Sequence, residues 1–342
     1  MEKTRKFLLN NIVPITFFIL SILAISIANV SFNFIANELY RRIIRNIIMV
    51  TALVIPIIAG MGINFSIILG ALSAQCAIIF VVDKEIYGIE GFIITLIISI
   101  LISIIIGNII GYIINKSKGR EMITSLVIGL LGTSIYNLIF MVGYGSIIKP
   151  KNSSIMLSNG LGIQSMVDVF RLKEVILEYK FIPILCIVLV TSLVLYLLNS
   201  KFGTKLKVIG ENMNNAYALG IDVDKNRRYA IAISTVLASI GQITFILDIG
   251  TLNVYTGHLN IDIFASAALL AGGATMSNAN LKNVFIGVVL FHTLFIVSPL
   301  AGKQLFQNAA LGEYFRSFVA YSTIVFSLMM NIKKNDSTKS SI

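Results

Sequence analysis

The sequence predicts an all-α, polytopic membrane protein of about ten transmembrane helices, one of them short or broken by glycines, and three observations support this fold class. Hydrophobic residues make up 56% of the 342 residues, and charged residues make up only 13%, about half the share usual in soluble domains. Apolar runs recur along the chain at roughly the 20-residue length that crosses a hydrocarbon core. Lysine and arginine gather at the ends of these runs, as topology signals do.

The predicted spans follow one another with short connections at most junctions. The short stretch Gly60 to Ile63 joins the end of the second span to the third, which predicts a tight helical pair. The eighth span is short and contains adjacent glycines, which predicts a broken or re-entrant helix. The ten spans are 9–31, 42–60, 64–82, 89–114, 121–142, 180–199, 229–250, 262–278, 283–300 and 312–332.

These spans define one transmembrane domain over residues 1–332, followed by a polar stretch, 333–342, that is predicted to be a disordered cytoplasmic tail. Two hydrophilic segments interrupt the domain, at 143–179 and 201–228. Most lysine and arginine residues lie inside when both termini and segment 201–228 are cytoplasmic, so 143–179 is predicted to pack over the outer mouth. Arg41, Arg42 and Arg45 do not fit this orientation and are predicted to form an interfacial turn before the second span.

The chain carries no recognisable catalytic, ATP-binding or metal-binding motif. There is no G-x-x-x-x-G-K-[ST] sequence to cradle phosphates, so the chain is not expected to hydrolyse ATP by itself. His258 and His292 have no cysteine or carboxylate at metal-ligand spacing. The net charge of +11 does not form a single basic stripe, which argues against a nucleic-acid partner. The sequence therefore predicts a non-enzymatic membrane protein that binds no cofactor or metal and has lipid as a neighbour.

Uncharged polar side chains recur inside the predicted spans. Thr235, Ser239 and Gln242 share one helical face, and Asn64 is placed to cap the third span. Such groups either line an aqueous path for a neutral polar solute or form hydrogen bonds between helices, and both interpretations remain open. The candidate path residues are Asn64, Ser66, Asn137, Gln242, Gly272 and Gly273.

Segment 201–228 is predicted to contain a short helix, Asn212–Leu219. Asn212 is placed to cap its start, and Gly220 suits the left-handed position after its end. Asp222 is placed to cap the helix that continues into the seventh span. Met213, Ala216 and Tyr217 would share one exposed face. This face would serve as a docking surface for a soluble partner, or the helix would be a solvated loop helix lying on the membrane.

Three stretches resemble permease subunits of ATP-binding cassette (ABC) importers, in the branched-chain amino acid/ribose/nucleoside family. The stretch VIGENMNNAYALGIDVDK resembles the family's coupling segment, whose pattern is approximately G-x-N-x-x-A-A-x-x-x-G-I. Tyr217 replaces the second alanine of that pattern. The matching residues are Gly210, Asn212, Ala216, Gly220 and Ile221.

The other two stretches extend the resemblance over about residues 45–330. IPIIAGMGINFSIILGALSAQ is similar to the family's junction between the second and third spans, and ASAALLAGGATMSNANLKNVFIG is similar to its alanine-rich, double-glycine segment. The second Gly-Gly pair that often follows is absent, and residues 277–280 occupy its place. This departure puts the geometry of that turn in doubt.

The resemblance implies an importer subunit that moves a sugar, an amino acid or a nucleoside across the bacterial plasma membrane. Two ABC ATPase subunits would bind ATP and dock on the coupling segment, an extracytoplasmic solute-binding protein would deliver the solute, and the chain would pair with itself or a sister permease. The coupling role would fall on Gly210, Glu211, Asn212, Met213, Ala216, Tyr217, Gly220 and Ile221.

Two other classes of protein remain as alternatives. An ion-coupled secondary transporter or channel is disfavoured because charged residues are scarce inside the predicted spans. A non-transport membrane scaffold or enzyme is disfavoured because the chain has no catalytic set of residues.

Overall fold

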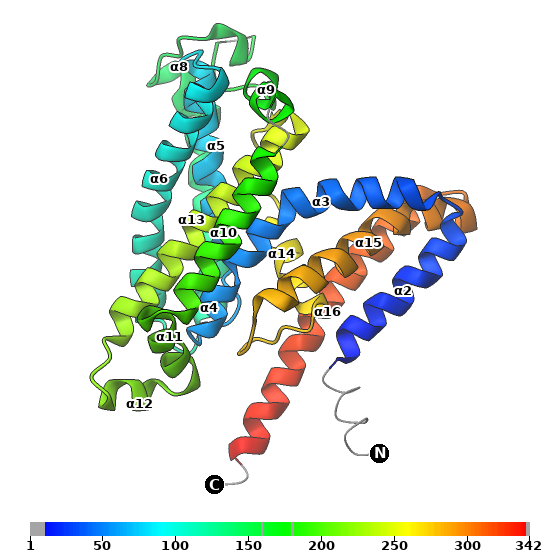
Figure 1. Ribbon diagram of the computed structural model, residues 1–342. Coiled ribbons are helices and arrows are strands. Elements are labelled where there is room, and N and C mark those ends of the chain that lie inside the picture. Colours follow the sequence, from blue (N-terminus) through cyan, green and yellow to red (C-terminus); the bar gives the residue numbers. More distant parts are fainter. Residues whose placement is uncertain (1–10, 159, 179–180, 340–342) are drawn as a thin grey trace.

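The computed structural model describes the backbone of residues 11–158, 160–178 and 181–339, and nearly all of it is helical (Figure 1). Side chains are described throughout these ranges except at 175–178, 309, 326–328 and 330–339. Long apolar helices without a strand framework confirm the predicted all-α, polytopic fold class.

Every predicted span contains a helix. Among the described residues, five helices are long and apolar enough to cross a membrane: α6, α7 with its extension to Ser146, α10, α13 and α15. The helices of the spans are α2 (Ile12–Ala28), α3 (Phe32–Ala52), α4 (Val54–Ile58), α5 (Ile67–Asp83), α6 (Gly88–Lys116), α7 (Glu121–Leu138), α10 (Ile182–Asn199), α13 (Val223–Ile249), α14 (Ile261–Ala271), α15 (Leu281–Phe306) and α16 (Ala309–Lys339).

Shorter elements lie in the two hydrophilic segments and after α13. The two strands pair antiparallel, with Val167 opposite Leu252. This pairing holds segment 143–178 against the chain that follows α13. The short elements are η1 (Ile139–Gly143), α8 (Tyr144–Ser146), η2 (Ser153–Ile155), β1 (Met166–Asp168), α9 (Phe170–Glu178), α11 (Lys201–Glu211), α12 (Met213–Ala218) and β2 (Thr251–Asn253).

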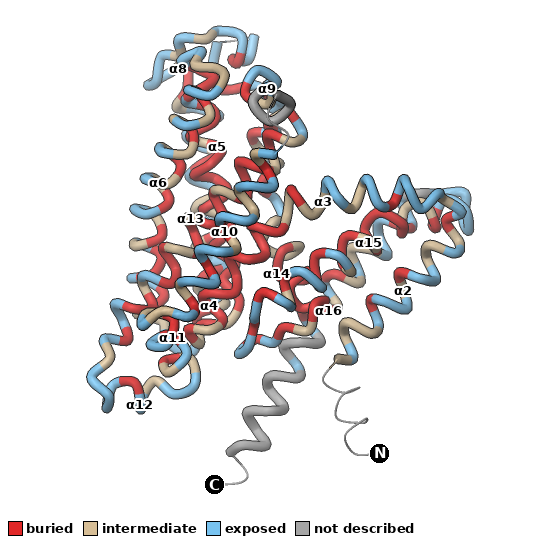
Figure 2. Tube along the Cα trace, viewed as in Figure 1, coloured by how far each residue is buried: buried red, intermediate tan, exposed pale blue. Residues whose placement is uncertain are grey.

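The helices form two groups that α3 connects (Figure 1). In the first group α13 packs against α5 and α6, and in the second α15 packs against α2, α14 and α16. Burial follows this arrangement: α5 and α13 are buried along most of their length, whereas α6 is exposed along its outward side (Figure 2). The exposed side of α6 is apolar, as expected for a surface in contact with lipid or with another apolar protein surface.

Glycines allow α13 to lie very close to its neighbours. A Cβ atom at Gly70 of α5 would lie 2.4 Å from the carbonyl oxygen of Thr235, and one at Gly107 of α6 would lie 2.7 Å from the Cα atom of Ala232. Small residues at such contacts are typical of helices packed within membranes, where close van der Waals contact drives association. They position α13 as the central helix of the first group.

The predicted interfacial turn at Arg41, Arg42 and Arg45 is wrong. All three residues lie inside α3, which begins at Phe32, where Ser31 caps it by accepting a hydrogen bond from the Phe34 amide. Within this helix Arg45 has a partner on α13: its Nε donates to the carboxylate of Asp248 near the end of that helix. One of the three charges that did not fit the predicted orientation is therefore paired.

Two other predictions concern helix ends. Helix α16 continues to Lys339, so residues 333–339 extend a helix where a disordered tail was expected, while residues 340–342 lie outside the described residues. Helix α14 has 11 residues, and its length of about 16 Å is too short to cross a membrane. It ends at Gly272, and Gly273 follows with φ +86°. The eighth span is broken, as predicted.

Candidate functional site

Helices α11 and α12 lie together beside the start of α13, at what we call the coupling end of the molecule (Figure 1). The capping residues predicted for α12 are confirmed. The Oδ1 atom of Asn212 accepts from the backbone amides of Asn214 at 2.8 Å and Asn215 at 3.2 Å. Gly220 has φ +71°, and Asp222 caps α13 by accepting from the Lys225 amide at 3.0 Å. Local side-chain chemistry therefore defines both ends of this segment.

The predicted exposed face of Met213, Ala216 and Tyr217 is wrong in part. Ala216 is fully buried and packs with Ile209 of α11 and Val223 of α13, and Met213 is half-buried against the same cluster. A helix as short as α12 stays attached only by burying its apolar side, so these two residues face the protein. Tyr217 is 49% exposed. The outward surface consists of Asn214, Asn215, Tyr217, Ala218 and Leu219.

A buried arginine connects α12 to the spanning helices. Arg227, in the first turns of α13, has no exposed side-chain surface. Its Nη2 donates to the Oε1 atom of Glu121, the first residue of α7, at 2.5 Å, and its Nη1 lies 3.2 Å from the Sδ atom of Met213. One side chain therefore contacts α7, α12 and its own helix, so a displacement of α12 would be felt at the start of α7.

Lys118 makes a second connection, between the α6–α7 turn and the same region. Its Nζ donates to the hydroxyl of Tyr217 at 2.7 Å and pairs with Asp224 at 2.5 Å. Burial lowers the pKa of Lys118, but the hydrogen bonds to Asp224 and Tyr217 outweigh it, so the pKa is raised above its usual value. Tyr217 is thus both exposed and tied to the α6–α7 turn.

The coupling segment also touches the junction between the second and third spans. A Cβ atom at Gly210 would lie 2.2 Å from the carbonyl oxygen of Ile58, and one at Gly60 would lie 2.9 Å from the Cα atom of Gly210. Gly60 has φ +72°, a conformation that favours glycine. Two of the stretches singled out in the sequence therefore meet backbone to backbone, and Gly210 lies in this contact rather than on the outward surface.

Two of the candidate path residues lie at this junction. Asn64 and Ser66 are buried, and the Oδ1 atom of Asn64 accepts from the backbone amide of Ser66 at 3.1 Å. Ser66, not Asn64, occupies the N-cap position of α5. The Nδ2 atom of Asn64 is 3.5 Å from the Oγ atom of Ser234 on α13. These groups bond within the junction and to α13, so they serve the hydrogen-bonding use that the sequence left open beside a role in a path.

The other candidate path residues lie elsewhere, so the structure does not bring the predicted set together. Gln242 is buried in α13, and its Nε2 donates to the carbonyl oxygen of Gly257 at 3.2 Å. Asn137 is half-buried on α7. At the end of α14 a Cβ atom on Gly272 would lie 1.8 Å from the carbonyl oxygen of Asn283 in α15, so Gly272 is a packing residue. A role in a path stays a prediction for the whole set.

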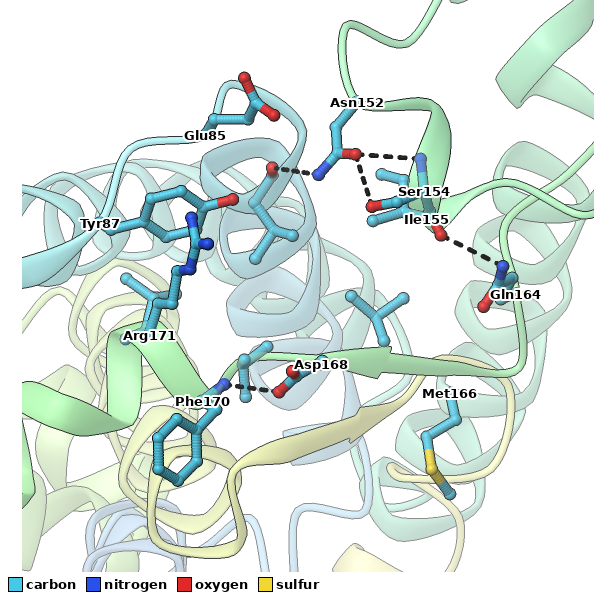
Figure 3. A pocket seen from close by; sticks show the side chains of 14 residues that line it. Glu85, Tyr87, Asn152, Ser154, Ile155, Gln164, Met166, Asp168, Phe170 and Arg171 are labelled. Carbon is cyan, nitrogen blue, oxygen red and sulfur yellow. Dashed lines mark hydrogen bonds between the residues drawn. The ribbon is translucent and has the colours of Figure 1, made fainter.

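The opposite end of the molecule carries segment 143–178, folded over the ends of α5 and α13. The carboxylate of Asp83 accepts from the Lys151 amide at 2.8 Å, and the Val169 amide donates to the carbonyl oxygen of Gly250 at 3.1 Å. A pocket opens between the α5–α6 turn, β1 and the start of α9, with the Arg171 guanidinium 4.8 Å from the ring centre of Tyr87 (Figure 3). This end therefore presents a polar, hollowed surface.

The comparisons with known proteins define the class. Residues 35–332 match the family described as the permease component of branched-chain amino acid transport systems. The chain belongs to this family, and its family and apolar helices make it a multi-pass protein of the plasma membrane. No solved structure matches it.

The curated relatives are distant. An autoinducer 2 import system permease protein, LsrC, of Photorhabdus laumondii subsp. laumondii is 25% identical over 53% of this chain and 55% of its own length. The LsrC protein of Yersinia pseudotuberculosis serotype IB is 26% identical over 49% of this chain and 48% of its own. A probable branched-chain amino acid transport permease protein, LivH, of Methanocaldococcus jannaschii is 30% identical over 35% of this chain and 37% of its own. The matches span about half the length of these relatives or less.

Several buried polar residues that interact with one another in the structure were not predicted from the sequence. Arg227 and Glu121 each stand at the start of a predicted span, so opposite charges at one membrane boundary were a usable signal. Gln75 in the third span was not considered, and His258 after the seventh was considered only as a metal ligand. An amide and an imidazole in largely apolar surroundings need hydrogen-bond partners, and that requirement alone could have linked them.

Proposed function

We propose that the chain is the membrane-spanning subunit of an ABC importer that moves a small polar solute, with ATP binding and hydrolysis on separate ATPase subunits. These subunits contact the outward surface of α12. The chain itself binds no cofactor in this proposal. One observation carries it: an exposed, well-capped helix is attached to α7 and α13 through a fully buried arginine. Such an attachment suits a helix that transmits force, because its contacts with the spans are buried and specific.

The remaining parts of the proposal rest on the family and on the two ends of the molecule. The coupling end faces the cytoplasm, and segment 143–178 receives an extracytoplasmic solute-binding protein. The chain pairs with a second copy of itself or with a sister permease through part of its exposed apolar surface. Membership of a permease family supports these roles, and the polar pocket beside Tyr87 and Arg171 supports docking at the opposite end.

The docking proposal is tested by co-purification of the chain with the ATPase subunits of its importer. Tyr217→Asp places a charge on the outward surface of α12 and is expected to reduce the recovered ATPase at least about tenfold, the effect of about 1.4 kcal/mol in binding free energy. Phe170→Asp is a matched control, because Phe170 is also 49% exposed but lies at the opposite end. It should leave recovery unchanged.

Two results would contradict the proposal. Equal recovery of the ATPase with Tyr217→Asp and with Phe170→Asp would show that α12 is not the docking surface. Solute uptake that continues without any ATPase, and that follows an ion gradient instead, would show that the chain is a secondary transporter. Uptake in membrane vesicles with and without ATP separates these cases.

A further inference from the structure

Four uncharged side chains meet in the interior of the first helix group, away from the coupling end. They are Gln75 of α5, Gln242 of α13, Tyr136 of α7 and His258 from the loop between β2 and α14. All four are at least 95% buried. Four separate segments of the chain thus contribute one polar group each to the same place.

Contacts among these residues show that they form one cluster around Gly257 and His258. The Oε1 atom of Gln75 is 3.3 Å from the Nδ1 atom of His258, and the Tyr136 and His258 ring centres are 5.4 Å apart. Gln242 donates to the carbonyl oxygen of Gly257 at 3.2 Å. A Cβ atom on Gly257 would lie 3.4 Å from the Nε2 atom of Gln75. The loop therefore lies between the two glutamines.

Each of the four side chains keeps a buried polar atom without a hydrogen-bond partner among the described residues. These atoms are the Nε2 of Gln75, the Oε1 of Gln242, the Nε2 of His258 and the hydroxyl of Tyr136. A buried polar atom without a partner costs free energy, and such atoms are rare in folded proteins. Four in one cluster offer hydrogen-bonding capacity that a solute or ordered water could satisfy.

The chemistry of the cluster defines the class of that molecule. An amide N–H only donates, an amide oxygen only accepts, and the imidazole nitrogen and the phenol hydroxyl complement either kind of group. None of the four carries a fixed charge that would pair with the ammonium or carboxylate group of an amino acid. Neutral hydroxyl groups, which donate and accept together, match this set.

The depth of the cluster places it within the membrane-spanning part. Gln75 precedes the end of α5 by eight residues, and Gln242 precedes the end of α13 by seven, which corresponds to about 10–12 Å along each helix. The cluster therefore lies below the surface formed by segment 143–178, in the half of the molecule remote from α12.

We propose that Gln75, Gln242, His258 and Tyr136 bind the hydroxyl groups of a neutral, polyhydroxylated solute during its passage. The inference rests on the proposed transport function and narrows it from small polar solutes in general to sugars and nucleosides. In the closed arrangement seen here the four groups are sealed from solvent. The loop that carries Gly257 and His258 has to move for a solute to enter.

The test measures thermal unfolding of the purified complex of the chain and its ATPase subunits, without the binding protein. Two pools serve as probes at about 50 mM, a concentration that favours detection of weak binding: neutral compounds (D-ribose, D-glucose and uridine) and zwitterions (L-leucine, L-valine and L-alanine). Binding to the folded state raises the unfolding temperature. The neutral pool is expected to raise it by about 2 °C or more, and the zwitterionic pool is expected to leave it unchanged.

Variants connect the shift to the cluster. Gln75→Leu and Gln242→Leu, made separately, should abolish the shift caused by the neutral pool. Ser99→Ala is the matched control, because Ser99 of α6 is also fully buried with an unpartnered Oγ atom and lies outside the cluster, so the shift should remain. Recovery of the ATPase subunits reports that each variant is folded.

Several outcomes would overturn the inference. One is a rise in unfolding temperature with the zwitterionic pool alone. A second is no rise with either pool, which would mean that ordered water satisfies the cluster. A third is a rise with the neutral pool that persists in both leucine variants. Recovery of the ATPase subunits with the unaltered chain is a separate result. Its loss would contradict the proposed function, whereas a failed shift with intact recovery contradicts only the solute assignment.

Discussion

Arg227 and Glu121 form a buried ion pair that joins the start of α13 to the start of α7, with Nη2 and Oε1 2.5 Å apart. The same guanidinium contacts Met213 of α12. A charge held in this way is costly to leave without its partner, since removing one member of a buried pair leaves the other uncompensated. The pair therefore both stabilises the coupling end and defines how α12 is attached to it.

The first prediction concerns this pair. Glu121→Gln should lower the free energy of unfolding by about 3–5 kcal/mol, because the charge of Arg227 stays buried without compensation. Replacing both residues, with Arg227→Met added, should recover a large part of the loss. Urea unfolding of the single and double variants in detergent gives the coupling free energy. Additive losses would mean that the two side chains act independently.

The second prediction concerns the contact between Gly210 and Ile58. Gly210→Ala places a methyl group 2.2 Å from the Ile58 carbonyl oxygen, so α11 and α4 must separate. We expect a loss of about 1–3 kcal/mol in stability and reduced transport. Gly143→Ala is the control, since its added methyl group would meet only the Cγ2 atom of Ile139, at 3.8 Å. Thermal unfolding of both variants checks this, and equal behaviour would refute the tight contact.

The third prediction concerns the cap of α12. Asn212→Ala removes the acceptor for the amides of Asn214 and Asn215 and should destabilise α12 by about 1 kcal/mol. Asn212→Asp should restore most of the loss, because aspartate caps equally well. Hydrogen exchange of the two amides is the measurement. Unchanged protection in Asn212→Ala would show that the cap does not maintain the helix.

The fourth prediction concerns pH. The pKa of Lys118 is raised above its unfolded value, so its link to Asp224 and Tyr217 stabilises the fold fully below that unfolded value and is lost as pH rises through the folded pKa. The stability difference between the unaltered chain and Lys118→Met should stay constant from about pH 7 to 9 and shrink at more alkaline pH. Thermal unfolding of both proteins, measured from neutral pH into the alkaline range, tests this prediction. A stability difference that grows with pH would contradict it.

How much the sequence could predict depended on whether the cause was local. The caps at Asn212, Gly220 and Asp222 follow from neighbouring residues, and the structure confirms them. The orientation of Ala216 depends on Ile209 and Val223, which pack against it only when α11, α12 and α13 are assembled. Residue spacing shows which side chains share a face of a helix, but it does not show which face packs against the rest of the protein.

The distinction between local and long-range causes also explains why the pairing of Arg45 and the cluster around Gln75 were not predicted. Arg45 looked misplaced because its partner, Asp248, is 203 residues away. Gln75 and His258 are 183 residues apart and come together through the loop after β2. The ten spans, by contrast, follow from composition within each window, and each contains a helix.

The contact between Gly60 and Gly210 has a mechanical consequence. Two helices separated by side chains can absorb a small displacement when rotamers change, so the displacement fades with distance. Here the backbone of α11 rests on the backbone at the end of α4, with no side chain between them. Because no side chains lie between the two backbones to adjust, a displacement of α11 by about an ångström is transmitted almost fully to the junction that leads into α5.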